Sequence, residues 1–431
     1  MDCCDKKQII KLIKAKVVPA LGCTEPIAVA LATAKAKETL NSHAERIEIF
    51  VSDNIYKNGM GVIVPGTNIP GLDIAAALGA IGGKSNLNLE VLKNISKDDI
   101  LKAKKLIKDK RVIVKTKPVA EKLYVESICY NEKNKARVII KNNHANITNI
   151  QYNEKIILEK EDENIVNSNN NNSPELSVKK IYEFATQVPV NDVKFILEAA
   201  EMNKRISEEG LKGDYGLKIG KKLSKNIKKG LLSDSILLSA IIRTAAATDA
   251  RMAGYKLPVM SNSGSGNQGI TSTMPVIAVA EKLNVDEEKY IRALILSSLI
   301  TIHIKNYLGP LSALCGCVVA ATGSAAGITY LFDGNYNNIV IAIKNMIADI
   351  TGMICDGAKP GCALKVASGT YSAFQAAILA IEDIVPPDNN GIVEEDVEQT
   401  IKNLANIGAK GMEKTDKLIL DIMLKANSNK N

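Results

Sequence analysis

The sequence changes its pattern at Val166-Asn-Ser-Asn-Asn-Asn-Asn-Ser-Pro174. A run of Asn and Ser offers no apolar surface to bury, which is typical of a flexible linker. After it, from residue 175 onward, nearly every apolar pattern has the period of a helix. Before it, apolar and polar side chains alternate as in β-strands over residues 111–114, 123–130, 136–141 and 147–158.

The first part also contains helical patterns. Apolar spacing predicts helices over residues 5–18, 27–40 and 72–81, whereas residues 46–64 alternate and predict two further strands. We therefore expect the fold class α+β. The predicted divisions are an α+β domain over residues 1–165, an Asn-rich linker over 166–174 and a large all-α domain over 175–431.

Composition excludes several classes of protein. The chain has 431 residues, of which 46% are hydrophobic and 24% charged, and this excludes intrinsic disorder. The net charge of +8 is spread over short Lys clusters at helical spacing, and the chain has no Trp and only five Phe. We therefore expect neither a nucleic-acid partner nor an aromatic sugar-binding groove. The expected partner is a small molecule.

The N-terminal sequence MDCCDKKQIIKLIK has no uninterrupted apolar segment, so it does not resemble a signal peptide, and we expect a cytoplasmic protein. Residues 306–332 lack charge, but their Gly, Ser and Thr content favours a buried helix over a membrane span. Few surface aromatics and a mostly buried helical domain are compatible with a homo-oligomer.

Two groups of cysteines in the second part could meet in space. Cys355-Asp-Gly-Ala-Lys-Pro-Gly-Cys362 joins two predicted helices, and Cys315-Gly-Cys317 precedes it in an uncharged segment. Two cysteines with six residues between them are also common as inert core residues. Three thiolates can hold a 4Fe-4S cluster and leave one iron free as a Lewis acid, which suits an elimination reaction. Either Cys315 or Cys317 could be the third ligand.

A further cysteine lies in Pro19-Ala-Leu-Gly-Cys-Thr-Glu-Pro26, just before a predicted helix. The positive end of the helix dipole should lower the pKa of Cys23 and raise its thiolate fraction, as a general base requires. The alternative is a small buried cysteine in a turn.

Residues 261–269, Ser-Asn-Ser-Gly-Ser-Gly-Asn-Gln-Gly, contain the spacing G-x-G-x-x-G. A dinucleotide site would need strands before and after the next helix, and the following segments are helical in period. The loop is instead suited to a substrate carboxylate, with a structural tight turn as the alternative. The three histidines, His43, His144 and His303, do not cluster in sequence.

The Pro19–Leu31 segment, the 261–269 loop, the Cys-Gly-Cys pair and the 355–362 loop together resemble the L-cysteine desulfidase family. That family is related to the α-chain of iron-sulfur L-serine dehydratases. The resemblance covers nearly the whole chain and implies a 4Fe-4S enzyme that converts L-cysteine and water to pyruvate, ammonia and hydrogen sulfide without pyridoxal phosphate.

The resemblance also implies roles for single residues. Cys23 falls on the catalytic cysteine, and the cluster ligands fall on Cys315, Cys355 and Cys362. The substrate-binding residues that we predict are Thr24, Glu25, Ser263, Ser265, Asn267 and Gln268. The C-terminal residues 427–431 lack the cysteine that some serine dehydratases place in their own site. The alternatives are the same reaction on L-serine and a non-catalytic iron-sulfur sensor.

Overall fold

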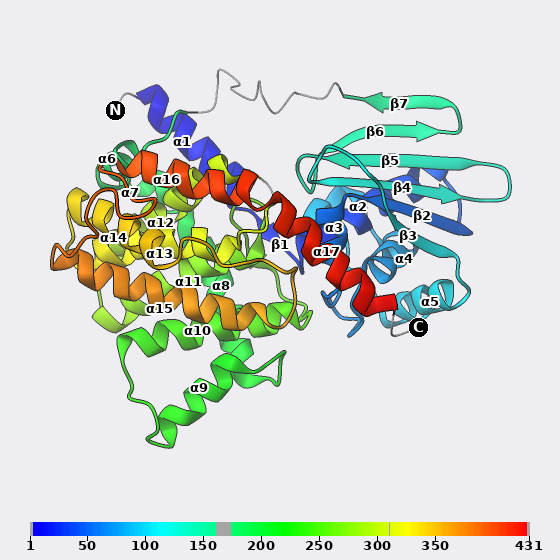
Figure 1. Cartoon of the computed structure of the whole chain (residues 1–431). Coiled ribbons are helices and arrows are strands. Elements are labelled where there is room, and N and C mark those ends of the chain that lie inside the picture. Colours follow the sequence, from blue (N-terminus) through cyan, green and yellow to red (C-terminus); the bar gives the residue numbers. More distant parts are fainter. Residues whose placement is uncertain (1–2, 161–173, 310, 429–431) are drawn as a thin grey trace.

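The structure is a computed structural model, and it describes residues 3–160, 174–309 and 311–428. The predicted linker 166–174, apart from Pro174, lies outside the described residues. A part with a sheet and helices lies beside a larger helical part (Figure 1). The predicted fold class, α+β with a large all-α part, is confirmed.

The main sheet has the strand order β3-β2-β4-β5-β6-β7. Only the β2–β3 pair is parallel, because helices connect these two strands; the other neighbours are antiparallel. The strands are β2 (Arg46–Val51), β3 (Val112–Thr116), β4 (Tyr124–Tyr130), β5 (Lys135–Lys141), β6 (Ile147–Tyr152) and β7 (Lys155–Glu159).

Two strand predictions in this part are wrong in detail. Residues 46–64 contain one strand, β2, because the segment after β2 turns into the helix α3 (Asp53–Gly59), and Ile63 makes only an isolated bridge with Pro70. Gly61 and Pro65 explain this, since Gly weakens a strand and Pro lacks the N–H that a ladder needs. The predicted strand 147–158 is two strands, because Asn153 turns the chain with a left-handed φ of 48°.

One face of the sheet is covered by α2 (Thr24–Leu40), which is buried over most of its length. Its alanines let α4 (Leu72–Gly82) approach closely: a Cβ at Gly79 would lie 2.4 Å from the carbonyl oxygen of Ala30. The remaining elements here are η1 (Ser85–Glu90) and α5 (Lys97–Lys108). Buried side chains of α2, α4 and the sheet form one apolar core.

The helical part has its own core around the buried helices α12 (Glu287–Leu308) and α13 (Gly316–Leu331). Among the described residues, no helix is both long and apolar enough to cross a membrane. The other helices of this part are α6 (Val178–Gln187), α7 (Val190–Val193), α8 (Ile196–Lys212), α9 (Ile219–Lys228), α10 (Ile236–Met252), α11 (Gly266–Leu283), α14 (Tyr336–Asp349), α15 (Cys362–Ile381), α16 (Val397–Asn406) and η3 (Ile407–Gly411).

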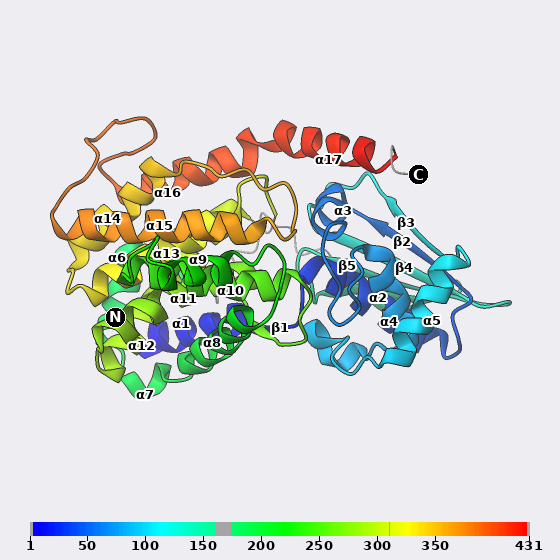
Figure 2. The same ribbon diagram turned by 90° about the horizontal axis from the view of Figure 1, so that it is seen from below.

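Three elements connect the two parts. The N-terminal helix α1 (Cys3–Lys16) packs Ile9 and Ile13 into the core of the helical part. The two-residue strand β1 (Pro19–Ala20) pairs with β8 (Val259–Met260) and lies between the parts (Figures 1 and 2). The C-terminal helix α17 (Glu413–Ser428) extends from the helical part to α3 (Figure 2).

Candidate active site

A cavity of about 110 Å³ lies where the two parts meet, and the first turns of four helices line it. Cys23 is the N-cap of α2, Ser265 of α11 and Cys315 of α13, and Cys362 is the first residue of α15. A helix N-terminus presents free N–H groups and positive potential, so four of them favour an anionic ligand.

All ten predicted site residues line this one cavity. They are Cys23, Thr24, Glu25, Ser263, Ser265, Asn267, Gln268, Cys315, Cys355 and Cys362. They come from segments that are separated by up to 339 residues of sequence, from position 23 to position 362. Cys317 lines the same cavity.

A short antiparallel bridge holds two of the thiols. Leu314 pairs with Ile354, the Cys315 N–H donates to the Met353 carbonyl at 2.7 Å, and the Cys355 N–H donates to the Ala313 carbonyl at 2.6 Å. Hydrogen bonds between thiols follow from this pairing. The Sγ atoms of Cys315 and Cys317 are 3.3 Å apart, and the Cys315 thiol also forms a hydrogen bond with the Cys355 thiol.

The third thiol is held by the loop that begins at Cys355. Gly357 has a φ of 88°, and a Cβ at this position would lie 2.5 Å from the carbonyl oxygen of Lys57. Any side chain would therefore both strain the turn and collide with α3. The loop then closes through a hydrogen bond from the Cys362 N–H to the Lys359 carbonyl at 2.9 Å.

The donor set and the surrounding charge fit an iron-sulfur cluster. Besides Cys23, four cysteines line the cavity, Cys315, Cys317, Cys355 and Cys362, and so do the cations of Arg251, Lys305 and Lys365, which would balance thiolates and a cluster. Among the described residues, no three His, Cys, Asp or Glu side chains are arranged to hold a single metal ion. A cluster differs from a single ion because each thiolate binds a different iron atom.

Cys23 does not have the lowered pKa that its place at a helix start predicts. Burial and the negative charge of Glu25 raise the pKa of Cys23 well above its usual value, and these effects exceed the opposing charge of Arg251. The thiol donates to Glu25 Oε2 at 3.0 Å. That prediction was wrong because the helix dipole acts here on a thiol that is buried beside a carboxylate.

Glu25 is held as a carboxylate by several donors. Its oxygens accept hydrogen bonds from Cys23, from Thr24 Oγ1 at 3.2 Å and from Asn58 Nδ2 at 3.1 Å. Burial alone would raise the pKa of Glu25, but His144 and these hydrogen bonds together lower it. Burial lowers the pKa of His144 itself. Cys23 and Glu25 thus form a buried thiol–carboxylate pair.

The 261–269 loop is not a dinucleotide site, because it follows a two-residue antiparallel strand. Ser263 and Gly264 have φ values of 49° and 83°, and Ser265 Oγ caps α11 by accepting from the Gln268 N–H at 3.4 Å. Arg251 Nη1 donates to Asn267 Oδ1 at 2.8 Å. The loop therefore supports a buried guanidinium at the edge of the cavity.

The cavity residues that the sequence analysis did not predict include Asn58, His144, Arg251 and Lys305. They come from α3, the β5–β6 turn, α10 and α12, so no local motif joins them. For two of these residues the sequence did contain a signal of a functional role. Arg251 and Lys305 are charged residues in helices that are otherwise largely buried, where a charge needs a partner or a function.

Four of the residues that line the cavity have a buried polar atom without a hydrogen-bond partner among the described residues. These atoms are Asn58 Oδ1, His144 Nε2, Arg251 Nε and Gln268 Oε1. Buried polar atoms are nearly always paired, so such a group indicates a polar ligand. Two of the atoms accept hydrogen bonds and one donates, which matches the ammonium and carboxylate of an amino acid.

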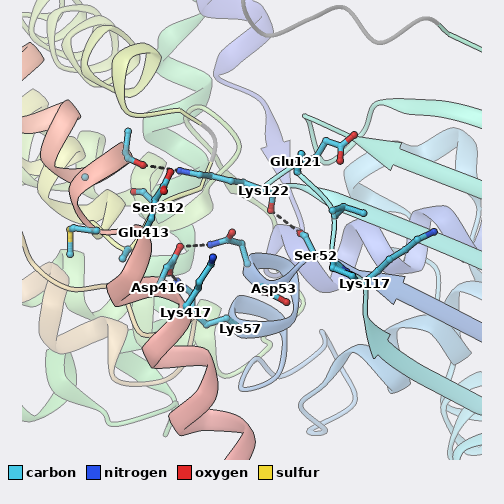
Figure 3. Close-up of a pocket in the computed structure, with 18 residues that line it drawn as sticks. Ser52, Asp53, Lys57, Lys117, Glu121, Lys122, Ser312, Glu413, Asp416 and Lys417 are labelled. Carbon is cyan, nitrogen blue, oxygen red and sulfur yellow. Dashed lines mark hydrogen bonds and ion pairs between the residues drawn. The ribbon is translucent and has the colours of Figure 1, made fainter.

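A second cavity, of about 260 Å³, lies beside the first between α3, the β3–β4 loop and α17 (Figure 3). Ser312 lines both cavities. Lys57 forms an ion pair with Asp416 here, and its Nζ also lies 3.4 Å from the carbonyl oxygen of Cys355. No cysteine lines this second cavity, so we place the candidate active site in the first.

Comparisons with known proteins show the family to which this chain is related. The family model described as the serine dehydratase alpha chain matches residues 86–421. The "UPF0597 protein" of Bacteroides thetaiotaomicron is 49% identical over 420 residues, which cover 97% of this chain and 98% of that protein. The "UPF0597 protein" of Phocaeicola vulgatus is 50% identical over 421 residues, covering 97% of each chain. That of Shewanella pealeana is 47% identical, covering 96% of this chain and 98% of its own length.

Proposed function

Because the chain belongs to the serine dehydratase alpha chain family, we propose that it is a 4Fe-4S-dependent lyase that acts on L-cysteine. The reaction is L-cysteine plus water to pyruvate, ammonia and hydrogen sulfide. The observation that carries this proposal is the cavity where the thiols of Cys315, Cys355 and Cys362 meet the buried Cys23–Glu25 pair.

We assign the cluster to the thiolates of Cys315, Cys355 and Cys362, with Cys317 as the alternative to Cys315. When bound, such a cluster supplies one iron without a protein ligand, which acts as a Lewis acid toward the leaving group. The four helix N-termini and the cations around the cavity stabilise the negative charge of the thiolates. Complete ligation by four cysteines would instead suit electron transfer.

Cys23 is the proposed group that removes the α-proton of the substrate. Its thiol is protonated at rest, since burial and Glu25 raise its pKa. Glu25 Oε2, at 3.0 Å, is the acceptor through which the thiol gives up its proton before it takes the α-proton. Thr24 and Asn58 act through Glu25, because both donate to its oxygens.

The unpartnered polar atoms define a proposed orientation for the substrate. Arg251 Nε and the N-terminus of α11, with Ser263 and Ser265, bind the carboxylate. The ammonium donates to Asn58 Oδ1 and Gln268 Oε1, two acceptors of the cavity that have no hydrogen-bond partner among the described residues. Asn267 holds Arg251 in place through the 2.8 Å hydrogen bond to its Nη1.

The second candidate is the same elimination on L-serine, which the description of the matching family favours. In that reaction the hydroxyl leaves in place of the thiol, and the residues keep their roles. Both substrates have the same charged groups around the α-carbon, so the proposed binding atoms serve either one.

The test begins with protein purified without oxygen, whose visible spectrum reports the cluster. L-Cysteine and L-serine are then supplied separately while pyruvate, ammonia and sulfide are measured. We expect equal amounts of sulfide and pyruvate from L-cysteine and a lower kcat/KM for L-serine. A higher kcat/KM for L-serine would establish the dehydratase instead. A cluster without products from either amino acid would overturn the enzymatic proposal and favour a sensor.

A further inference from the structure

The outer face of α15 carries an unusual set of exposed side chains. Sixteen large apolar side chains are exposed among the described residues, and six of them lie on or next to this helix. Leu364, Tyr371 and Ile378 lie on the helix itself and are 45–52% exposed. Ile354 lies beside its first turn, where its carbonyl accepts from Lys365 Nζ at 2.5 Å. Ile384 and Val385 follow its last turn.

The exposed positions of α15 repeat with the period of a coiled coil. They are Leu364, Ser368, Tyr371, Gln375 and Ile378, followed by the C-cap residue Glu382, and they are separated by steps of four, three, four, three and four residues. Alternating steps of three and four place side chains along one seam that packs against another helix at a shallow angle. The seam is uncharged up to its last residue. In Figure 1, α15 lies on the near side of the helical part.

The seam is complementary to itself. Leu364 and Ile378 each lie seven residues from Tyr371, so an antiparallel second copy brings Leu364 opposite Ile378 and Tyr371 opposite its own equivalent. A two-fold interface requires such reciprocity, in which residue i of each subunit meets residue j of the other. The apolar side chains beyond the two ends of the helix extend the same contact.

Charge supports the antiparallel arrangement. Lys359 and Lys365 lie at the N-terminal end of α15, where both pair with Asp356, so one positive charge is in excess there. The C-terminal end carries Glu382 and Asp383, both exposed. In an antiparallel pair each lysine end lies beside the acidic end of the other copy, and the helix dipoles also oppose one another favourably.

From this pattern we propose that two copies of this chain form a dimer through α15, with the two-fold axis near Tyr371. The interface is independent of the chemistry proposed above. It places the Cys362 end of each α15 near the C-terminal end of the partner helix, so the thiol-bearing loop of each subunit, residues 355–362, lies at the edge of the dimer contact.

The test measures the oligomeric state of the full-length protein by sedimentation velocity across a dilution series. We expect a dimer, and we expect Ile378→Glu to weaken it by about 100-fold or more, because two unpaired carboxylates would enter the seam. Leu101→Glu is the matched control: Leu101 is 64% exposed on α5, in the other part of the chain. A monomeric wild type, or an Ile378→Glu variant that dimerises as tightly as the control, would overturn the proposal.

A cross-link identifies the interface directly and does not depend on whether Ile378→Glu folds normally. In a Cys4→Ser background, which removes an exposed thiol, Tyr371→Cys brings two thiols together at the axis. A short bismaleimide should then give a covalent dimer, whereas Leu101→Cys should give none. Equal yields from the two variants, or a product only from Leu101→Cys, would exclude α15 as the contact.

Discussion

The Cys23 thiol donates a hydrogen bond to the Glu25 carboxylate across 3.0 Å, at the first turn of α2, and both side chains are at least 93% buried. A thiol at a helix start is expected to ionise easily. The carboxylate two residues further along reverses that expectation, because its charge and the burial both favour the protonated thiol. The pair is therefore a proton donor and acceptor in contact, next to the cysteines assigned to the cluster.

Replacing Cys23 by Ala should lower the kcat for L-cysteine by a factor of about 10²–10⁴, while the visible spectrum of the cluster remains. Cys129→Ala is the matched control, since Cys129 is also a buried free cysteine but lies in β4 outside the cavity. The control should keep its activity. Full activity in Cys23→Ala would remove Cys23 from the mechanism.

Glu25→Gln should lower the pKa of Cys23, because the charge of Glu25 is one of the causes that raise it. The pH dependence of Cys23 alkylation by iodoacetamide, followed by peptide mass spectrometry, measures this pKa. Its midpoint should move to lower pH in Glu25→Gln and stay near the wild-type value in Glu25→Asp. Turnover should still fall in Glu25→Gln, since the amide cannot accept the thiol proton. An unchanged alkylation profile would contradict the electrostatic coupling of the pair.

Asp249 makes the stability of the fold depend on pH. Burial raises the pKa of its carboxyl to about 6, although backbone N–H groups at the start of α9, including that of Gly220 at 3.1 Å, partly oppose the shift. Because the folded pKa exceeds the unfolded one, the folded state binds the proton more tightly. The resulting stability is full below about pH 4 and is lost as the pH rises through about 6.

The matching measurement compares urea unfolding of wild type and Asp249→Asn between pH 4 and pH 7. The wild type should lose stability relative to the variant as the pH rises, since Asn cannot ionise. Asp234→Asn, at a side chain that is 63% exposed, is the control and should follow the wild type. A pH-independent difference between Asp249→Asn and wild type would show that Asp249 does not titrate in this range.

Lys57 is 1% exposed, and its ion pair with Asp416 joins α3 to α17 (Figure 3). Asp416→Ala should destabilise the fold by about 3 kcal/mol, because it leaves a buried ammonium without its carboxylate. Urea unfolding measures the loss. Lys57→Met combined with Asp416→Leu should recover most of the stability, since an apolar pair removes both charges. Asp98→Ala, which breaks the exposed pair with Lys102, should leave the midpoint unchanged.

Sequence alone predicted the elements whose signals are local. The strands β2 to β5 and the helix starts at α2 and α15 follow from period, Pro and Gly within a few residues. The same holds for the thiol-bearing loop, where Gly357 needs a positive φ. The errors arose where the same local period fits two structures, as in residues 53–64, or where one Asn turns a long alternating run into two strands.

The cavity itself was decided by tertiary structure. Asn58, His144, Arg251 and Lys305 have no common motif, and they meet only because α3, a sheet turn, α10 and α12 pack around the same point. The tertiary structure also determines the pKa of Cys23. The helix dipole at this position can be read from the local sequence, but the burial that raises the pKa depends on the whole fold. Periodicity and turn chemistry act over a few residues and can be read from the sequence. Desolvation and convergence depend on packing between distant segments, so only the folded chain determines them.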